Sequence, residues 1–226
     1  ARRQRQMCIR DSIDKVLEEK RLSFEDGVKL FKSSDLLTVG YLANYITEKK
    51  NGKYAYFVIN RQINPTNVCV LDCKFCAFAQ MDKNDPKAYE MSYDEILEKV
   101  KYAVENSATE VHIVGGLHPD WDFNKYLNIV SIIKKNFPQL HIKAFTAVEI
   151  DYFSQISGLS YEEILIKLKE AGLGSLPGGG AEIFSPNIRR IIAPKKIGYK
   201  KYLEIHKTAH KLGLHSTTTC LLYTSP

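Results

Sequence analysis

From about residue 56 onward the chain alternates short strand patterns with helical patterns, and this alternation constrains the fold more than any other feature. The strand patterns are rich in β-branched residues, and two helical patterns follow a capping serine, Ser92 or Ser160. The predicted strands span residues 56–63, 110–114, 141–146, 174–176 and 215–219. The predicted helices span residues 93–105, 123–136, 161–171, 186–192 and 199–212. Such alternation is typical of parallel β/α units.

Five β/α units in succession predict an α/β fold, a closed or partial (β/α) barrel. Right-handed crossovers place the helices outside the sheet and bring the carboxyl ends of all strands to one face. We therefore expect the functional residues at that face.

The ends of the chain follow a different pattern. Residues 13–52 predict an N-terminal helical segment of three short helices, with Ser23 and Asp26 as a capping pair, ahead of a barrel core over residues 53–219. Residues 1–12 and 220–226 do not read as regular structure. We expect those ends to be non-native or disordered, and the natural chain to continue beyond residue 219.

The composition limits the class of protein. With 226 residues, of which 44% are hydrophobic, the chain can bury one sizeable core. Its net charge is +6, but the lysines lie along the whole chain next to glutamates, so we expect no nucleic-acid partner. No apolar run approaches the roughly 18 residues of a membrane span, and the start has no signal-peptide pattern. We expect a cytoplasmic protein without a membrane partner.

Three of the five cysteines, Cys69, Cys73 and Cys76, form a C-x3-C-x2-C loop after the first predicted strand. Thiolates are soft ligands that hold iron–sulfur clusters or zinc. Three cysteines leave one iron of a four-iron cluster without a protein ligand, whereas structural zinc takes four Cys or His ligands. The spacing therefore predicts a [4Fe–4S] cluster with three Cys ligands. Zinc completed by His112 or His118 is the alternative.

Two glycine-rich loops follow other predicted strands. Gly115 and Gly116 come after the second strand, and residues 175–184, with three consecutive glycines and Glu182, come after the fourth. Glycine lets a backbone approach a ligand closely, so both loops are candidate ligand contacts. A tight turn alone, or a structural glutamate, is the alternative for each loop.

Several polar residues are candidates for work on a substrate. His118 and Glu149 follow the second and third strands and are tentative catalytic residues. A loop histidine of no special chemistry, for His118, and a helix cap, for Glu149, are the alternatives. Four basic residues follow the second glycine loop and suit a carboxylated substrate, although solvated charge is the default for the two lysines: Arg189, Arg190, Lys195 and Lys196.

The cysteine spacing, with Phe75 before the last cysteine, resembles that of radical S-adenosylmethionine enzymes. Five segments together resemble the menaquinone-pathway branch that includes aminofutalosine synthase, over about residues 22–219: NPTNVCVLDCKFCAF, EVHIVGGLHP, KAFTAVEI, GLGSLPGGGAEIF and EIHKTAHKLG. The end departs from that family, because HSTTTC stands where the family has a strand resembling TNATMLYGH. Later strands are absent, and we expect this truncated chain to be inactive.

The resemblance implies Cys69, Cys73 and Cys76 as cluster ligands, and Gly115, Gly116 and Glu182 as contacts to S-adenosylmethionine. The implied transferase reaction consumes S-adenosylmethionine as a co-substrate and adds a 5′-deoxyadenosyl radical to 3-[(1-carboxyvinyl)oxy]benzoate, a carboxylated aromatic enol ether, to give aminodeoxyfutalosine in menaquinone biosynthesis. The implied electron donor is of the flavodoxin or ferredoxin kind. Alternatives are a cyclic dehypoxanthine futalosine synthase, a deazaflavin-precursor synthase and, more distantly, a non-catalytic zinc-binding module.

Overall fold

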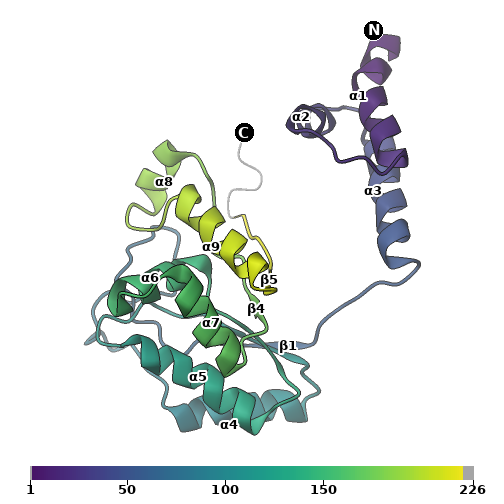
Figure 1. The fold of residues 1–226 in the computed structure, drawn as a ribbon. Helices are drawn as coiled ribbons and strands as arrows, with labels where there is room; N and C mark the ends of the chain where they lie inside the picture. The colour runs from purple at the N-terminus through teal and green to yellow at the C-terminus, as the bar shows by residue number, and fades with distance from the viewer. Residues whose placement is uncertain (1, 221–226) are drawn as a thin grey trace. The chain divides into compact units, whose positions relative to one another are not determined.

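The structure is a computed structural model that describes residues 2–220, with side chains from residue 9 onward. Contacts divide the chain into two compact units, residues 1–57 and residues 58–226. Figure 1 labels the helices and strands of both units. Each unit is described by itself.

The first unit is helical, as the sequence predicts. It contains α1 (Arg2–Leu17), α2 (Phe24–Phe31) and α3 (Leu36–Asn51), and α1 contacts both of the others. Helix α1 includes residues 2–12, for which we predicted no regular structure. The non-native origin of the two ends stays a prediction, and residues 221–226 lie outside the described part of the chain.

Asp26 joins the first two helices. Its carboxylate accepts hydrogen bonds from Ser12 Oγ at 3.0 Å, Lys15 Nζ at 2.6 Å and the Ser23 backbone N–H at 2.9 Å. Ser23 Oγ in turn accepts a hydrogen bond from the Asp26 backbone N–H at 3.2 Å, so the predicted capping box is confirmed. These bonds, the Lys15 bond first, hold the pKa of Asp26 well below its usual range.

A depressed carboxyl pKa makes stability depend on pH. The contribution is present above the ordinary pKa of about 4 and is lost as the pH falls through the lower folded-state value. We expect Asp26→Asn to lower the unfolding midpoint near pH 6, and the difference from wild type to shrink as the pH falls to about 2. Thermal unfolding followed by circular dichroism measures both midpoints. A difference that stays constant with pH would contradict the role of the Asp26 charge.

The second unit contains a five-stranded parallel sheet in the order β1-β2-β3-β4-β5. The strands are β1 (Asn60–Ile63), β2 (Glu110–Ile113), β3 (His141–Ala144), β4 (Ser175–Leu176) and β5 (His215–Ser216). Spatial order follows chain order, as in a (β/α) barrel and unlike a doubly wound sheet, which confirms the predicted partial barrel. The strands are shorter than predicted. β1 and β4 begin later than predicted, whereas β2, β3 and β5 end earlier because the chain turns into the loops at their carboxyl ends. β3, for example, ends at Ala144, and the next residue, Phe145, has a φ of +62°.

Six helices connect or follow these strands. They are α4 (Tyr93–Glu105), α5 (Phe123–Asn136), α6 (Ala147–Ser157), α7 (Tyr161–Ala171), α8 (Pro186–Ile192) and α9 (Tyr199–Lys211). Helices α4 and α5, α5 and α7, and α7 and α9 pack side by side (Figure 1). The predicted bounds of α4, α5, α7 and α8 are confirmed, and α9 ends one residue earlier. Helix α6 was missed.

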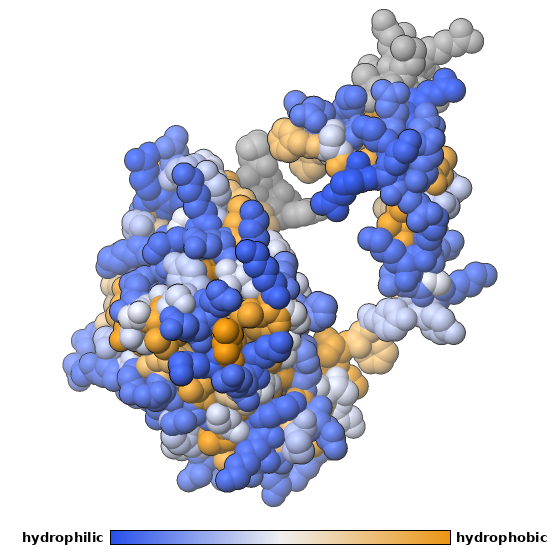
Figure 2. Space-filling model, in the orientation of Figure 1, coloured by the Kyte–Doolittle hydropathy of each residue, from blue (hydrophilic) through white to orange (hydrophobic). Residues whose placement is uncertain are grey.

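The core lies between the sheet and these helices. Five strand side chains on the helix-facing side have no exposed surface: Val111, Ile113, Ile142, Ala144 and Leu176. Figure 2 shows mostly hydrophilic residues on the outer surface of the helices, with a smaller apolar area among them. No helix in the described part of the chain is long and apolar enough to span a membrane.

Candidate functional site

The cysteine loop is tied to its surroundings at both ends and in the middle. The Cys69 N–H donates to the Gln80 carbonyl at 2.9 Å, and the Gln80 N–H donates back to Asn67 at 2.8 Å. The Val70 N–H donates to the Leu117 carbonyl at 3.0 Å, and the Lys74 N–H donates to Ile192 at 2.8 Å. The loop is therefore held by its own base, by the segment after β2 and by α8.

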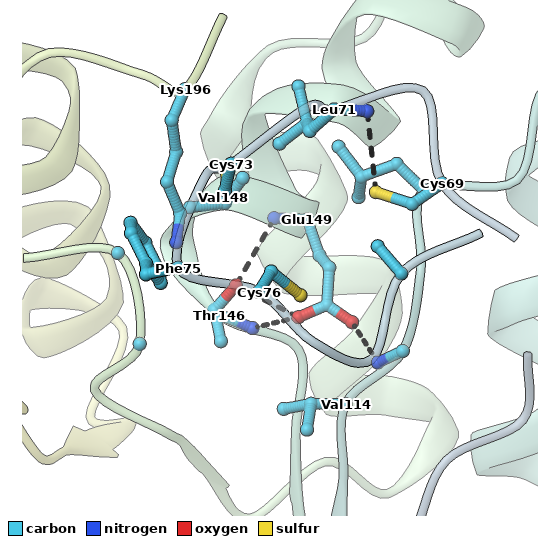
Figure 3. Close-up of a pocket in the computed structure, with 15 residues that line it drawn as sticks. Cys69, Leu71, Cys73, Phe75, Cys76, Val114, Thr146, Val148, Glu149 and Lys196 are labelled. Atoms are coloured by element: carbon cyan, nitrogen blue, oxygen red, sulfur yellow. Dashed lines mark hydrogen bonds between the residues drawn. The ribbon is translucent and has the colours of Figure 1, made fainter. Parts of the chain in front are cut away.

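All three cysteines of this loop line one cavity at the carboxyl ends of the strands (Figure 3). Gly115, Thr146, Glu149, Gly179, Gly180 and Lys196 line the same cavity. Its volume of about 160 Å³ is several times the roughly 30 Å³ share of one water molecule. The cavity thus has room for a group larger than a single ion.

The donor set fits an iron–sulfur cluster. Cys69 Sγ accepts a hydrogen bond from the Leu71 N–H at 3.4 Å, a contact of the kind that tunes cluster sulfurs (Figure 3). Burial raises the pKa of the Cys73 thiol, which disfavours the thiolate that iron requires, and the nearby Lys196 ammonium opposes part of this shift. Among the described residues, no three Cys, His, Asp or Glu side chains converge on one metal ion. Neither histidine of the zinc alternative, His112 or His118, lines this cavity, so neither is placed to supply the fourth ligand that structural zinc takes.

Glu149 is buried beside the cavity and joins two of its walls. Its carboxylate accepts hydrogen bonds from the Gly115 N–H at 3.1 Å, the Thr146 N–H at 2.6 Å and Thr146 Oγ1 at 2.9 Å (Figure 3). Burial raises the pKa of Glu149 to about 7 although these donors oppose the shift. The helix cap by Glu149 is therefore confirmed. The side chain also lines the cavity, and its catalytic role stays a prediction.

The two glycines after β2 have different surroundings. Gly115 lines the cavity, whereas Gly116 faces the base of the cysteine loop. A Cβ on Gly116 would lie 2.0 Å from the Val68 carbonyl oxygen, a distance that no side chain tolerates. The contact explains this glycine by close packing of two loops, and its predicted contact with S-adenosylmethionine stays a prediction.

His118 does not line the cavity; it belongs to a buried hydrogen-bond network. Its Nε2 lies 2.9 Å from Glu90 Oε1, and its Nδ1 accepts a hydrogen bond from the Asp120 N–H at 3.1 Å. The Trp121 ring stacks on the imidazole and donates to Glu90 Oε2 at 2.8 Å. These contacts give His118 a structural role that the sequence did not predict, and a catalytic role for His118 stays a prediction.

Glu182 and Lys196 form a largely buried ion pair at the glycine loop. Their charged atoms are 2.7 Å apart, with 11% and 13% of the side chains exposed. Lys196 lines the cavity and lies over the Phe75 ring, whereas Lys195 is largely exposed and pairs with Asp72. The expectation of solvated charge was therefore wrong for Lys196. Among the described residues that line the cavity, Lys196 is the only one with a cationic side chain.

Arg189 holds the glycine loop, residues 175–184, in place through hydrogen bonds to its backbone, and we call this arrangement the clamp. Its guanidinium donates to the carbonyls of Gly180 at 3.0 Å, Ala181 at 2.7 Å and Ile183 at 3.0 Å, and also to Ile197. Gly180 and Glu182 have φ values of +107° and +47°, so this loop has a backbone that requires support. Because backbone carbonyls use its donors, Arg189 does not receive a carboxylate, and that expectation was wrong.

Removing this clamp is expected to loosen the loop. Arg189→Met leaves buried carbonyls without donors, which we expect to lower the free energy of unfolding by about 3 kcal/mol and to speed amide exchange over residues 178–184. Arg190→Met is the matched control, since Arg190 is exposed and contacts only the nearby Asn187 among the described residues. Hydrogen exchange by mass spectrometry compares the two variants. Equal amide exchange over residues 178–184 in both variants would contradict the role of Arg189 in holding the glycine loop.

The geometry can be compared with known proteins. Residues 63–224 match the family described as the Radical SAM superfamily, which is more than half of the chain. The chain belongs to the radical SAM superfamily. This superfamily is one of enzymes that use a [4Fe–4S] cluster and S-adenosylmethionine, and the recognition made from the cysteine loop is confirmed.

Curated relatives carry two different names. The chain is 46% identical over 208 residues to an aminodeoxyfutalosine synthase of Thermus thermophilus, covering 92% of this chain and 56% of the relative. It is 37% identical over 227 residues to a 5-amino-6-(D-ribitylamino)uracil--L-tyrosine 4-hydroxyphenyl transferase of Nostoc punctiforme, covering 95% of this chain and 60% of the relative. The chain thus spans less than two thirds of the length of either relative.

Solved structures support the fold of this radical SAM chain. A structure titled as the hydrogenase maturase HydG aligns with a TM-score of 0.70 at 18% identity, covering 92% of this chain and 44% of that one. Methylornithine synthase (PylB) aligns with a TM-score of 0.66 at 20% identity, covering 90% and 57%. These similarities concern the α/β fold alone.

Proposed function

We propose that the protein from which this chain comes is an aminodeoxyfutalosine synthase. The observation that carries the proposal is the 46% identity to the Thermus thermophilus relative of that name over 92% of the chain, which includes the cysteine cavity. The proposed reaction joins the 5′-deoxyadenosyl group of S-adenosylmethionine to the enol-ether carbon of 3-[(1-carboxyvinyl)oxy]benzoate and ends with rearrangement and loss of carbon dioxide. The proposal includes an electron donor of the flavodoxin or ferredoxin kind.

In this proposal Cys69, Cys73 and Cys76 hold the cluster. The cluster, when bound, supplies the electron that cleaves the carbon–sulfur bond of S-adenosylmethionine. The residues of the chain position the co-substrate and exclude water. Lys196 holds an anionic group beside the cysteines, Glu182 fixes the position of Lys196, and Gly115 lets the backbone approach the ligand.

The test is a product assay under anaerobic conditions with reconstituted protein, the chemical reductant dithionite and 3-[(1-carboxyvinyl)oxy]benzoate. S-adenosylmethionine labelled in its adenosyl group is the co-substrate, and we expect the label in aminodeoxyfutalosine. The full-length protein is assayed beside this chain, because the chain spans 56% of the relative. Release of free 5′-deoxyadenosine without labelled product from the full-length protein would contradict the proposed addition.

The second candidate is the hydroxyphenyl transferase activity of the Nostoc punctiforme relative. Its support is the 37% identity over 95% of the chain. The same assay with 5-amino-6-(D-ribitylamino)uracil and tyrosine separates the two candidates. Turnover of that pair, with none of the benzoate, would replace the first proposal by the second.

A further inference from the structure

A row of polar side chains crosses the sheet on the side opposite the helices. Parallel register pairs Gln62 with His112, His112 with Lys143, Lys143 with Ser175, and Ser175 with His215. Paired residues of neighbouring strands lie on the same face of a sheet. Their chain neighbours Val111, Ile113, Ile142, Ala144 and Leu176 are fully buried on the helix side. We call Gln62, His112, Lys143, Ser175 and His215 the polar row.

This composition is unusual for the inner face of a barrel. Inner layers of closed (β/α) barrels are filled mostly by branched apolar residues that pack against one another. Gln62 and His215, at the two ends of the row, are exposed, and Ser175 Oγ lies 2.8 Å from His141 Nε2. The half-buried centre of the row, His112 and Lys143, is therefore the part of this face that suits a polar ligand.

The centre of the polar row has donors to spare. Lys143 Nζ donates to Glu110 Oε1 at 2.8 Å, and 17% of the Lys143 side chain is exposed. An ammonium has three donors, and only this one is used among the described residues. His112 is half-buried next to Lys143 and Glu110, and its ring has no hydrogen-bond partner in the described part of the chain. Lys143 and His112 are register partners on neighbouring strands, so both side chains, with their unused N–H groups, lie on the same face of the sheet.

The polar row lies next to the cysteine cavity. His112 precedes Val114, a lining residue of that cavity, by two positions on the same strand line. Two residues of a strand span about 7 Å and point to the same face. A substrate with one end in the cavity and an aromatic ring lying along the sheet is long enough to reach Lys143 and His112.

We propose that Lys143 and His112 bind a carboxylate of the substrate. The inference rests on the proposed function, whose substrate carries two carboxylates on an aromatic enol ether. A carboxylate accepts several hydrogen bonds and matches the ammonium charge. Glu110, 8% of whose side chain is exposed, holds Lys143 in place through one donor and leaves the others for the ligand.

The experiment measures binding of 3-[(1-carboxyvinyl)oxy]benzoate by titration calorimetry to full-length reconstituted protein. The double variant Glu110→Gln/Lys143→Met removes the pair together, so that no unpaired carboxylate stays buried. We expect its Kd to rise about tenfold or more, the usual scale for a lost hydrogen bond to a charged group. Lys143→Arg keeps the charge and should stay within about threefold of wild type.

Two further variants separate binding from folding. Glu110→Gln alone keeps the Lys143 ammonium and removes only the carboxylate that holds it, so we expect a smaller rise in Kd than in the double variant. A merely structural pair would give an equal rise in both variants. Lys167→Met, on the exposed side of α7, is the control and should bind like wild type. Cluster absorbance and unfolding midpoints confirm that each variant is folded.

The monomethyl esters of the substrate identify the group that is bound. For one of the two esters, the double variant should bind as well as wild type. Unchanged affinity of the double variant for the diacid, or an equal loss for both esters, would overturn the role of Lys143 while leaving the proposed function in place. Wild-type protein that neither binds nor converts the diacid would overturn both the role of Lys143 and the proposed function.

Discussion

Cys73→Ala is expected to abolish the cluster and, with it, cleavage of S-adenosylmethionine. Cys73 is one of three thiols on the wall of a single cavity. With only two thiolates, two of the four irons of a cluster, in place of one, would lack a protein ligand. The reconstituted variant should be colourless, without the broad visible absorbance of an iron–sulfur cluster. Formation of 5′-deoxyadenosine should fall to the level of a protein-free control.

Cys220→Ser is the matched control for this experiment. Cys220 is exposed, and its Sγ donates to the Glu182 carbonyl at 3.0 Å, a bond that a serine hydroxyl can replace. The control should keep iron, sulfide and visible absorbance at the wild-type level. Normal absorbance and normal 5′-deoxyadenosine in Cys73→Ala would rule out Cys73 as a ligand, and stoichiometric zinc in the wild type would favour the zinc-binding module.

Most of the barrel could be predicted because its signals are local. Ser92 and Ser160 each form a capping box, so the helices they begin were placed correctly from a few residues. Helix α6 also begins with a capping box, formed by Thr146 and Glu149, but its sequence AVEIDYFSQIS lacks a clear polar face. Most of its first turns are buried, which removes the 3.6-residue periodicity on which such predictions depend.

The cavity was predictable only in part. Parallel strands bring their carboxyl ends together, so the gathering of the cysteine loop, Gly115 and Glu149 follows from topology. Which of four basic residues points inward does not, because no local rule distinguishes Lys195 from Lys196. Arg189 turns to backbone carbonyls that only the folded loop presents. The direction of each of these side chains is set by contacts that exist only in the folded loop.

The environment of His118 also could not be predicted from the sequence. Its position after β2 made it a candidate, but its partner Glu90 is 28 residues away in the chain and precedes a different helix. That contact and the stacked Trp121 give the imidazole a buried structural environment. The sequence had no signal that linked these three side chains.

Gly116→Ala is expected to disturb the cysteine loop as strongly as loss of a ligand. The added Cβ would lie 2.0 Å from the Val68 carbonyl oxygen and 2.6 Å from its carbon, and both atoms belong to backbone. Backbone cannot rotate away as a flexible side chain would, so one loop must move. The displaced segment includes the Gly116 N–H to Thr66 carbonyl bond of 2.8 Å and adjoins Cys69.

Overpacking of this kind costs about 3 kcal/mol, which corresponds to a fall of about 10 °C in the unfolding midpoint for a chain of this size. We expect Gly116→Ala also to bind less iron during reconstitution, because Cys69 follows the displaced carbonyl directly. Gly198→Ala is the control, since a Cβ there meets nothing within 4 Å and φ is −76°. Calorimetry and iron analysis compare the two. If both variants unfold and load iron alike, the close approach of the two loops does not determine the shape of the cysteine loop, and cluster assembly depends on the thiols alone.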